Sequence, residues 1–130
     1  MSDNKDHQDG TKNVHAGTNH VGESVNTPIF LSSTYKLTEE RYAGWAAGAQ
    51  HTLLYSRLSS VNSDAVAQKI CAMEGGEDAE TFASGMAAIS STLMMLLSQG
   101  DHMVASADVY GGTYGLITEE LPRFGIETTM

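Results

Sequence analysis

Ser84, Gly85 and Met86 are residues whose types and spacing could bind an anion. They stand where a short apolar stretch gives way to a long, nearly uncharged helical pattern. The first backbone N–H groups of a helix lack partners within it and carry partial positive charge. A glycine at this point lets an anion approach the backbone closely. The three residues therefore suit a phosphate-binding turn, although an ordinary capped helix is the simpler interpretation when they are taken alone.

Two further groups of residues could contribute to the same chemistry. Tyr110 lies in a glycine-rich loop, Asp108–Gly115, and its ring could stack on an aromatic ligand. Tyr55 and Arg57 could together clamp a phosphate, since guanidinium groups match phosphate geometry. A packed loop tyrosine and a surface charge are the alternatives for these residues in isolation.

The elements that must position these groups follow a strand–helix alternation in the second half of the chain. This order predicts βαβ units and a parallel sheet, in which the carboxyl ends of the strands meet at the ligand. The Ser84 turn and the Tyr110 loop should therefore face one cleft. The expected helices begin at Asn62, at Ser84 and at Leu116. The first is capped by Asn62 or Ser63 and ended by Gly75-Gly76, the second runs to Gly100, and the third ends at Leu121 before Pro122. The expected strands are Ala79–Ala83, His102–Ser106 and Gly125–Met130.

The first half of the chain is less regular. Residues 1–13 are polar and are predicted to be disordered. Residues 14–61 contain one extended piece, Thr27–Tyr35, and one short helix, Glu39–Ala49, and are predicted to form an arm that reaches a neighbouring subunit. Residues 62–130 are predicted to begin a large α/β domain. The central helix of this domain is apolar nearly all round, so other elements must pack against several of its sides. The sequence therefore predicts that this chain is the first part of a longer protein.

Composition excludes several classes of function. The net charge is −9, with 7 Lys and Arg against 16 Asp and Glu, so nucleic acids and anionic membranes are not expected partners. The single cysteine, Cys71, cannot form an internal disulfide and fits a reducing cytosol. The histidines and Cys71 show no metal-ligand spacing, and neither G-x-G-x-x-G nor a Walker A sequence occurs. Serines, threonines and Gln99 make the uncharged Thr81–Gly100 stretch a poor membrane span.

Taken in order, the motifs resemble those of one enzyme family. The stretches that carry the resemblance are "VHAG", "PIF-SST", "YSR", "AMEGGEDAETFASGMAAI", "GDHMVASADVYGGTYGL" and "FGIETTM". On these stretches the chain is similar, over roughly residues 14–130, to the amino-terminal part of the pyridoxal-phosphate enzymes of cysteine and methionine metabolism. This family includes cystathionine γ-synthase, cystathionine γ-lyase, methionine γ-lyase and O-acetylhomoserine sulfhydrylase.

The resemblance implies a role for each candidate residue. Ser84, Gly85 and Met86 match the turn that holds the phosphate of pyridoxal 5'-phosphate. Tyr110 matches the tyrosine that stacks on the cofactor ring and assists proton transfer, and is the one candidate catalytic residue. Tyr55 and Arg57 match a pair that reaches across a subunit interface to the neighbour's cofactor phosphate.

The resemblance also implies the architecture and setting of the protein. The implied fold is α/β, with an amino-terminal arm and the first, incomplete part of a mainly parallel-sheet cofactor domain of the aspartate-aminotransferase type, fold type I. The expected assembly is a cytoplasmic homotetramer of two active dimers acting on a small amino-acid substrate, with no metal, membrane or nucleic acid.

Two features depart from the family pattern. Leu58–Asp64 reads "LSSVNSD" where the family commonly has Asn-Pro-Thr, so the local turn should differ. The Schiff-base lysine and the aspartate that pairs with the pyridine nitrogen lie downstream in the family, and none of the four lysines here stands in a matching position: Lys5, Lys12, Lys36 and Lys69.

The predicted function is therefore that of a trans-sulfuration enzyme, a C–S lyase or sulfur-amino-acid transferase, of which this chain is a fragment that is inactive alone. It would act by γ- or β-elimination or replacement on sulfur amino acids or O-acyl-homoserine. The sequence does not distinguish a lyase from a synthase. The alternatives are a non-catalytic phosphate- or nucleotide-binding α/β module and an inactive interaction fragment.

Overall fold

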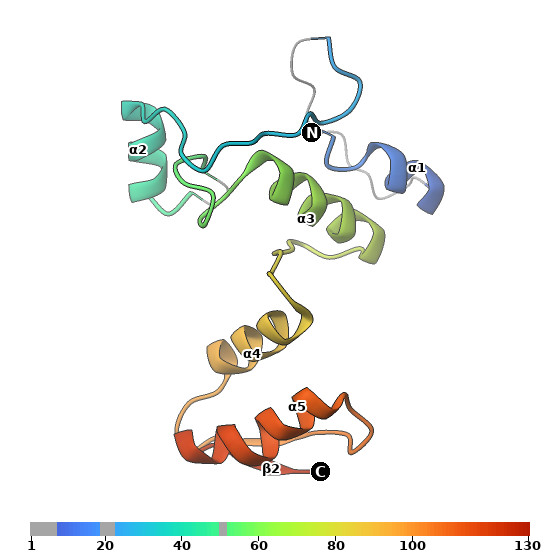
Figure 1. Cartoon of the computed structure of the whole chain (residues 1–130), viewed down its shortest axis with the longest axis vertical. Helices are drawn as coiled ribbons and strands as arrows, with labels where there is room; N and C mark the ends of the chain where they lie inside the picture. The colour runs from blue at the N-terminus through green and yellow to red at the C-terminus, as the bar shows by residue number, and fades with distance from the viewer. Residues whose placement is uncertain (1–7, 19–22, 50–51) are drawn as a thin grey trace. The chain divides into compact units, whose positions relative to one another are not determined.

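The computed structural model describes residues 8–18, 23–49 and 52–130, which form two compact units. The first unit ends at Thr81, and the second runs from Phe82 to Met130 (Figure 1). None of the described helices is both long and apolar enough to cross a membrane. The elements in chain order are α1 (Asp9–His15), α2 (Glu39–Ala46), α3 (Val61–Glu74), α4 (Gly85–Leu96), β1 (His102–Val104), α5 (Gly111–Gly115), the π-helical η2 (Leu116–Glu120), the 3₁₀-helical η3 (Leu121–Phe124) and β2 (Glu127–Thr129).

The longest helix of the first unit is α3. Its N-cap is Ser60, whose Oγ accepts a hydrogen bond from the Ser63 N–H at 3.1 Å. The cap had been predicted at Asn62 or Ser63, and this is wrong because Ser60 keeps an extended backbone while Val61 is already helical. Gly75 ends the helix in the left-handed conformation with φ of 69°, which confirms the predicted stop.

Helix α1 packs against α3 through a very close approach of two backbones. Gly17 has φ of +69°, and a Cβ at this position would lie 2.2 Å from the Ala65 carbonyl oxygen. Ala16 and Ala67 are the buried apolar residues of this contact. The predicted disorder of residues 1–13 is therefore wrong from Asp9 onward, and residues 1–7 lie outside the described part of the chain.

The extended piece Thr27–Tyr35 is held to α3 by one side chain. The Asn62 Oδ1 atom accepts from the Phe30 N–H at 2.8 Å, and Asn62 Nδ2 donates to the Pro28 carbonyl at 2.8 Å. Further along, Thr34 forms an antiparallel bridge with Tyr55. The predicted extended conformation is thus confirmed. The predicted helix Glu39–Ala49 is also present as α2, but it ends at Ala46.

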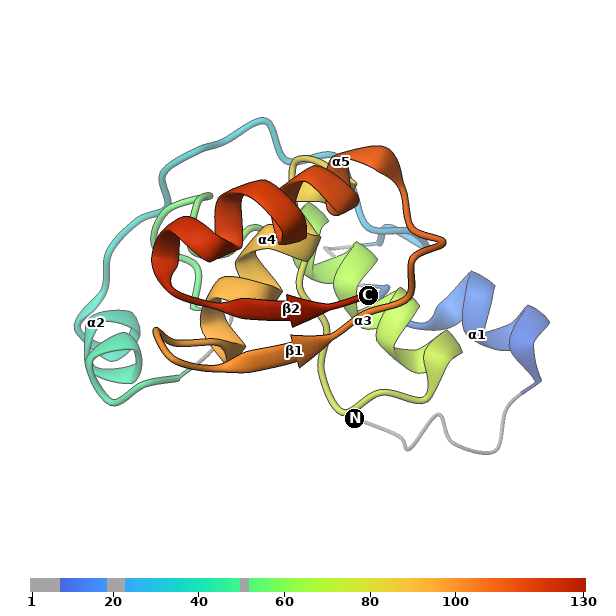
Figure 2. The same ribbon diagram turned by 90° about the horizontal axis from the view of Figure 1, so that it is seen from below.

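The second unit contains a two-stranded parallel sheet (Figure 2). His102, Met103 and Val104 of β1 pair with Glu127, Thr128 and Thr129 of β2, as the βαβ pattern predicted. The strand predicted at Ala79–Ala83 is wrong: these residues form no strand, and no strand in the described ranges pairs with them. A strand needs a hydrogen-bonded neighbour, which a short apolar run cannot supply by itself.

The connection from β1 to β2 is helical from Gly111 to Phe124. The helical part begins within the predicted loop Asp108–Gly115 and continues through Pro122, so the predicted helix Leu116–Leu121 is too short at both ends. Pro122 is tolerated because it lies in the first turn of η3, where its missing N–H costs no helical hydrogen bond.

The core of the second unit lies between this helical connection and the sheet. Ile117, Leu121 and Ile126 are buried, and side chains from α4 and β1 pack around them. The partly buried residues of this cluster are Leu93, Leu97, Met103, Ala105 and Val109. One side of α4 is thus packed, whereas Met94, Met95 and Leu96 on the same helix remain exposed.

Candidate functional site

The first turn of α4 presents a set of hydrogen-bond donors. Ser84 caps the helix, and its Oγ accepts from the Ala87 N–H at 3.1 Å. Within the described ranges, the N–H groups of Gly85 and Met86 have no hydrogen-bond partner. Ser84 and Gly85 are exposed, and a Cβ at Gly85 would meet no atom within 4 Å. Two N–H groups and the Ser84 hydroxyl proton are therefore free to bind an anion beside the positive end of the helix.

Tyr110 lies next to this turn. It immediately precedes α5, and its side chain is 73% exposed. An atom placed at the Cβ position of Gly112 would lie 2.7 Å from Tyr110 Cε1 and 3.3 Å from the Met86 sulfur. In addition, Thr113 Oγ1 donates to that sulfur at 3.6 Å. The Tyr110 ring and the Met86 side chain in the first turn of α4 thus lie close together. The sequence predicted that the Ser84 turn and the Tyr110 loop would be close, but that prediction relied on a strand at Ala79–Ala83 that does not form.

Tyr55 and Arg57 lie in the first unit, in a turn with several backbone contacts. The Ser56 N–H donates to the Ser33 carbonyl at 2.8 Å, and the Arg57 guanidinium carbon lies 5.4 Å from the centre of the Tyr55 ring. This is a cation–π distance. No carboxylate pairs with Arg57 in the described part of the chain, so its hydrogen-bond donors are available to an anion.

The turn after Arg57 forms without a proline. Ser59 is buried, with 4% of its surface exposed, and its hydroxyl donates to Asp64 Oδ2 at 2.7 Å. The next residue, Ser60, caps α3. The sequence "LSSVNSD" therefore supplies its own fixed connection between Arg57 and the helix. Sequence reasoning missed this bond, because Ser59 and Asp64 are five residues apart, whereas the capping box pairs residues three apart.

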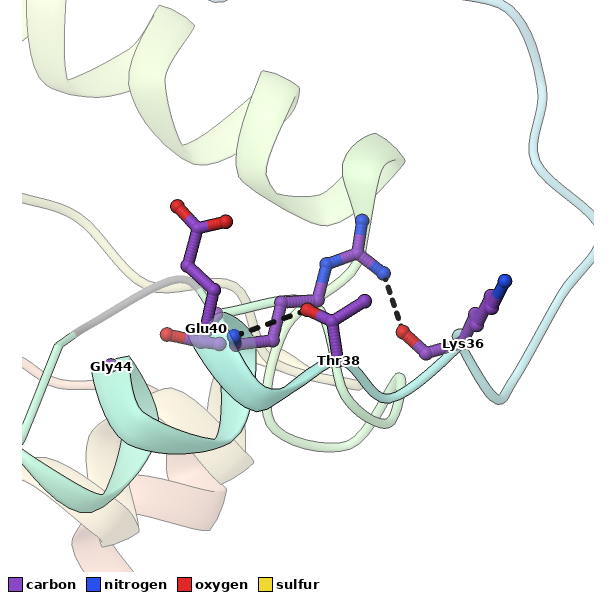
Figure 3. A pocket seen from close by; sticks show the side chains of 6 residues that line it. Lys36, Thr38, Glu40 and Gly44 are labelled. Atoms are coloured by element: carbon purple, nitrogen blue, oxygen red, sulfur yellow. Dashed lines mark hydrogen bonds between the residues drawn. The ribbon is translucent and has the colours of Figure 1, made fainter.

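A separate hollow of about 630 Å³ lies beside α2 (Figure 3). Arg41 borders it, donating from its backbone N–H to Thr38 Oγ1 at 3.3 Å and from Nη1 to the Lys36 carbonyl at 2.8 Å. None of the predicted site residues lines this hollow, and its charges are mixed. The lining residues are Lys36, Thr38, Glu40, Arg41, Gly44 and Thr52. In the described ranges, no group of three or more His, Cys, Asp or Glu could hold a metal ion.

Comparison with known sequences decides which family this geometry belongs to. Residues 10–130 match the profile of the Cys/Met metabolism PLP-dependent enzymes. The chain belongs to this family. It is 37% identical over 123 residues to an L-methionine gamma-lyase of Porphyromonas gingivalis, covering 92% of this chain and 31% of that protein. It is 53% identical over 107 residues to the cystathionine beta-lyase MetC of Bacillus subtilis, covering 82% of this chain and 25% of that protein.

A solved structure shows the fold. The chain superposes on metY from Campylobacter jejuni with a TM-score of 0.85 and 34% sequence identity, covering 94% of this chain and 31% of that one. That structure contains N'-pyridoxyl-lysine-5'-monophosphate. The predicted family and the predicted α/β architecture of fold type I are confirmed. This chain spans about a third or less of the length of these relatives.

Proposed function

We propose that the whole protein is a pyridoxal-phosphate-dependent enzyme of trans-sulfuration. The observation that carries this proposal is the donor set at the head of α4, where the N–H groups of Gly85 and Met86 lack partners beside the exposed Tyr110 ring. A phosphate dianion fits this set, because two backbone N–H groups, one hydroxyl and a helix N-terminus converge there. Membership of the family supports the choice of ligand.

When bound, pyridoxal phosphate would act as an electron sink for an amino acid's carbanion. The residues of this chain would bind and orient it. Gly85, Met86 and Ser84 would donate hydrogen bonds to the phosphate. Tyr110 would lie against the ring through its exposed face, and its hydroxyl would hold or move a proton at the Oη atom.

We further propose that Arg57 and Tyr55 bind the cofactor phosphate of a neighbouring copy of the protein. The turn that carries them is fixed by the Ser56–Ser33 and Ser59–Asp64 hydrogen bonds, so the guanidinium is presented from a rigid segment. Its available donors suit a phosphate. The proposed assembly is a homotetramer of two active dimers in the cytoplasm.

The proposed substrates are sulfur amino acids or O-acyl-homoserine. The proposed reaction is elimination or replacement of the group at the γ- or β-carbon. The names of the relatives, an L-methionine gamma-lyase and a cystathionine beta-lyase, support this class. Both names describe the cleavage of a carbon–sulfur bond, so a C–S lyase is the activity to assay first.

Trapping the cofactor with borohydride tests the proposed function. The protein expressed from its complete coding sequence is mixed with pyridoxal phosphate, reduced, digested and analysed by mass spectrometry. We expect one lysine to carry the pyridoxyl group, and that lysine to be none of Lys5, Lys12, Lys36 and Lys69. Absence of any adduct would refute the covalent mechanism.

Removing Arg57 tests the clamp. Arg57→Ala should weaken pyridoxal phosphate binding by about 1.5–3 kcal/mol, the value of a charge-assisted hydrogen bond. The measurement is a cofactor titration followed by absorbance. Arg123→Ala is the matched control, since Arg123 pairs with Glu120 on an exposed surface and its loss should leave the affinity unchanged. Equal affinities for the two variants would remove Arg57 from the site.

The proposed sharing of Arg57 between copies can be tested by mixing. Arg57→Ala and Tyr110→Ala subunits each lack one part of the site. If the parts come from different copies, hybrids will contain one site with both residues intact and will recover tight cofactor binding. Hybrids that bind no better than either parent would show that both residues serve the same copy.

A further inference from the structure

We propose that Gly112 is a positioning residue for Tyr110, because a Cβ at position 112 would force the tyrosine ring away from its present place beside the first turn of α4. This inference rests on the proposed function and adds to it the residue that sets the orientation of the stacking ring. Gly112 itself would touch neither cofactor nor substrate, and would act through Tyr110.

Steric contact is the first observation. A Cβ at Gly112 would lie 2.7 Å from Cε1 and 3.3 Å from Cδ1 of the Tyr110 ring. The shorter distance is far inside van der Waals contact, which begins near 3.5 Å between carbon atoms. An alanine at position 112 and the present position of the ring therefore exclude one another.

The backbone gives no competing reason for a glycine at this position. The glycines with positive φ are Gly17, Gly48, Gly75, Gly100 and Gly125, and Gly112 is not among them. It lies within α5, where alanine is the better helix former by about 1 kcal/mol. The space required by the Tyr110 ring thus explains the glycine, whereas backbone conformation and helix propensity do not.

The opposite side of this space is also occupied. The same Cβ would lie 3.3 Å from the Met86 sulfur, and that sulfur accepts a hydrogen bond from Thr113 Oγ1. The added methyl group could not move toward Met86 without disturbing this contact. The Tyr110 side chain is 73% exposed, so it is the group that can swing away. Gly112→Ala should therefore displace the ring while leaving the fold intact.

A double-mutant cycle tests the inference in the protein expressed from its complete coding sequence. Pyridoxal phosphate affinity is measured for the unmodified protein, Gly112→Ala, Tyr110→Ala and the double variant. We expect each single variant to weaken binding by roughly 5- to 10-fold, the value of an aromatic stacking contact. The double variant should bind no more weakly than Tyr110→Ala, because the effect of the methyl group passes through the ring. Independent, multiplying effects would overturn the inference.

Gly115→Ala is the matched control. Gly115 lies in the same helix, its φ is not positive, and a Cβ there would meet no atom within 4 Å. This variant should bind the cofactor as tightly as the unmodified protein. A loss equal to that of Gly112→Ala would show that alanine in α5, rather than the Tyr110 contact, weakens binding.

A measurement without cofactor separates this inference from the proposed function. In the unliganded protein, a nuclear Overhauser effect should connect the Gly112 α-protons with the Tyr110 ring. In Gly112→Ala the effect between residue 112 and this ring should be lost. The melting temperature of the variant should stay within a few degrees of that of the unmodified protein. Unchanged ring contacts would refute the positioning role. A protein that shows these contacts but binds no pyridoxal phosphate would refute the proposed function alone.

Discussion

Each of the two units is stabilised internally by a different kind of interaction. The second unit has an apolar core, in which Ile117, Leu121 and Ile126 are each 2% exposed or less. In the first unit, the buried residues of the described part are the small Ala16, Ala67 and Ser59. Its extended segment is instead fixed by hydrogen bonds, above all those of Asn62.

This difference follows from where the large apolar side chains lie. Ile29 and Leu31 in the extended segment of the first unit are 83% and 96% exposed, so they contribute almost no burial within their own unit. Backbone approach and polar contacts must then define the shape of the arm. Such contacts give modest net stabilisation but place a segment precisely. The turn that carries Arg57 is likewise fixed by hydrogen bonds.

The largest effect should come from the core of the second unit. Leu121→Ala should lower the free energy of unfolding of that unit by about 3–4 kcal/mol, because it removes a completely buried side chain. Thermal or urea unfolding followed by circular dichroism measures this. The control is Leu96→Ala, in an exposed position of α4, which should change stability by less than about 0.5 kcal/mol. Similar losses for both would contradict the assigned core.

A somewhat smaller effect is expected where α1 meets α3. Gly17→Ala should destabilise the first unit by about 2–3 kcal/mol, since the methyl group would meet the Ala65 carbonyl and the backbone has positive φ. Hydrogen exchange should show faster exchange in α3 and unchanged exchange in the second unit. Gly10→Ala, in an open position of α1, should be neutral or slightly stabilising. Equal protection in both variants would disprove the close approach.

A smaller change in stability should follow loss of the Asn62 contacts. Asn62→Ala leaves the Phe30 N–H and the Pro28 carbonyl without this partner and should cost about 1–2 kcal/mol. Proteolysis rates at the extended segment measure this most directly and should rise. Asn26→Ala, at an exposed position immediately before the extended segment, should leave them unchanged. An Asn62 variant that is cut no faster would mean that something else holds the arm.

Elements with strong local signals were predictable from the sequence. The Ser84 cap and the Gly75 stop each act within a few residues, and both appear in the structure. The strand predicted at Ala79–Ala83 is absent, because strand formation depends on a pairing partner that the local sequence does not specify. The helical start at Gly111 was missed because glycines are poor helix formers, and the local propensity gave no sign of it.

Some features of the candidate site were likewise predicted from the sequence, whereas others were not. The Tyr110 loop was predicted to lie beside the Ser84 turn, and the structure places Tyr110 near Met86. The strand at Ala79–Ala83, on which this prediction partly rested, is absent. The role proposed for Gly112 was not predictable, because it depends on where the side chains of Tyr110 and Met86 lie around position 112. The Ser59–Asp64 hydrogen bond was also missed, because the two residues are five positions apart and do not fit the capping-box spacing.

The central claim is that the head of α4 binds the cofactor phosphate, and two capping residues allow it to be tested. Ser84 caps α4 and Thr38 caps α2 through the same kind of hydrogen bond. Replacing either by alanine should cost about 1 kcal/mol in stability. The decisive measurement is the affinity of each variant for pyridoxal phosphate in the protein expressed from its complete coding sequence. We expect Ser84→Ala to weaken binding roughly 10- to 150-fold, with Ser84→Thr restoring most of it and Thr38→Ala unchanged. Equal affinity for Ser84→Ala and Thr38→Ala would contradict the claim.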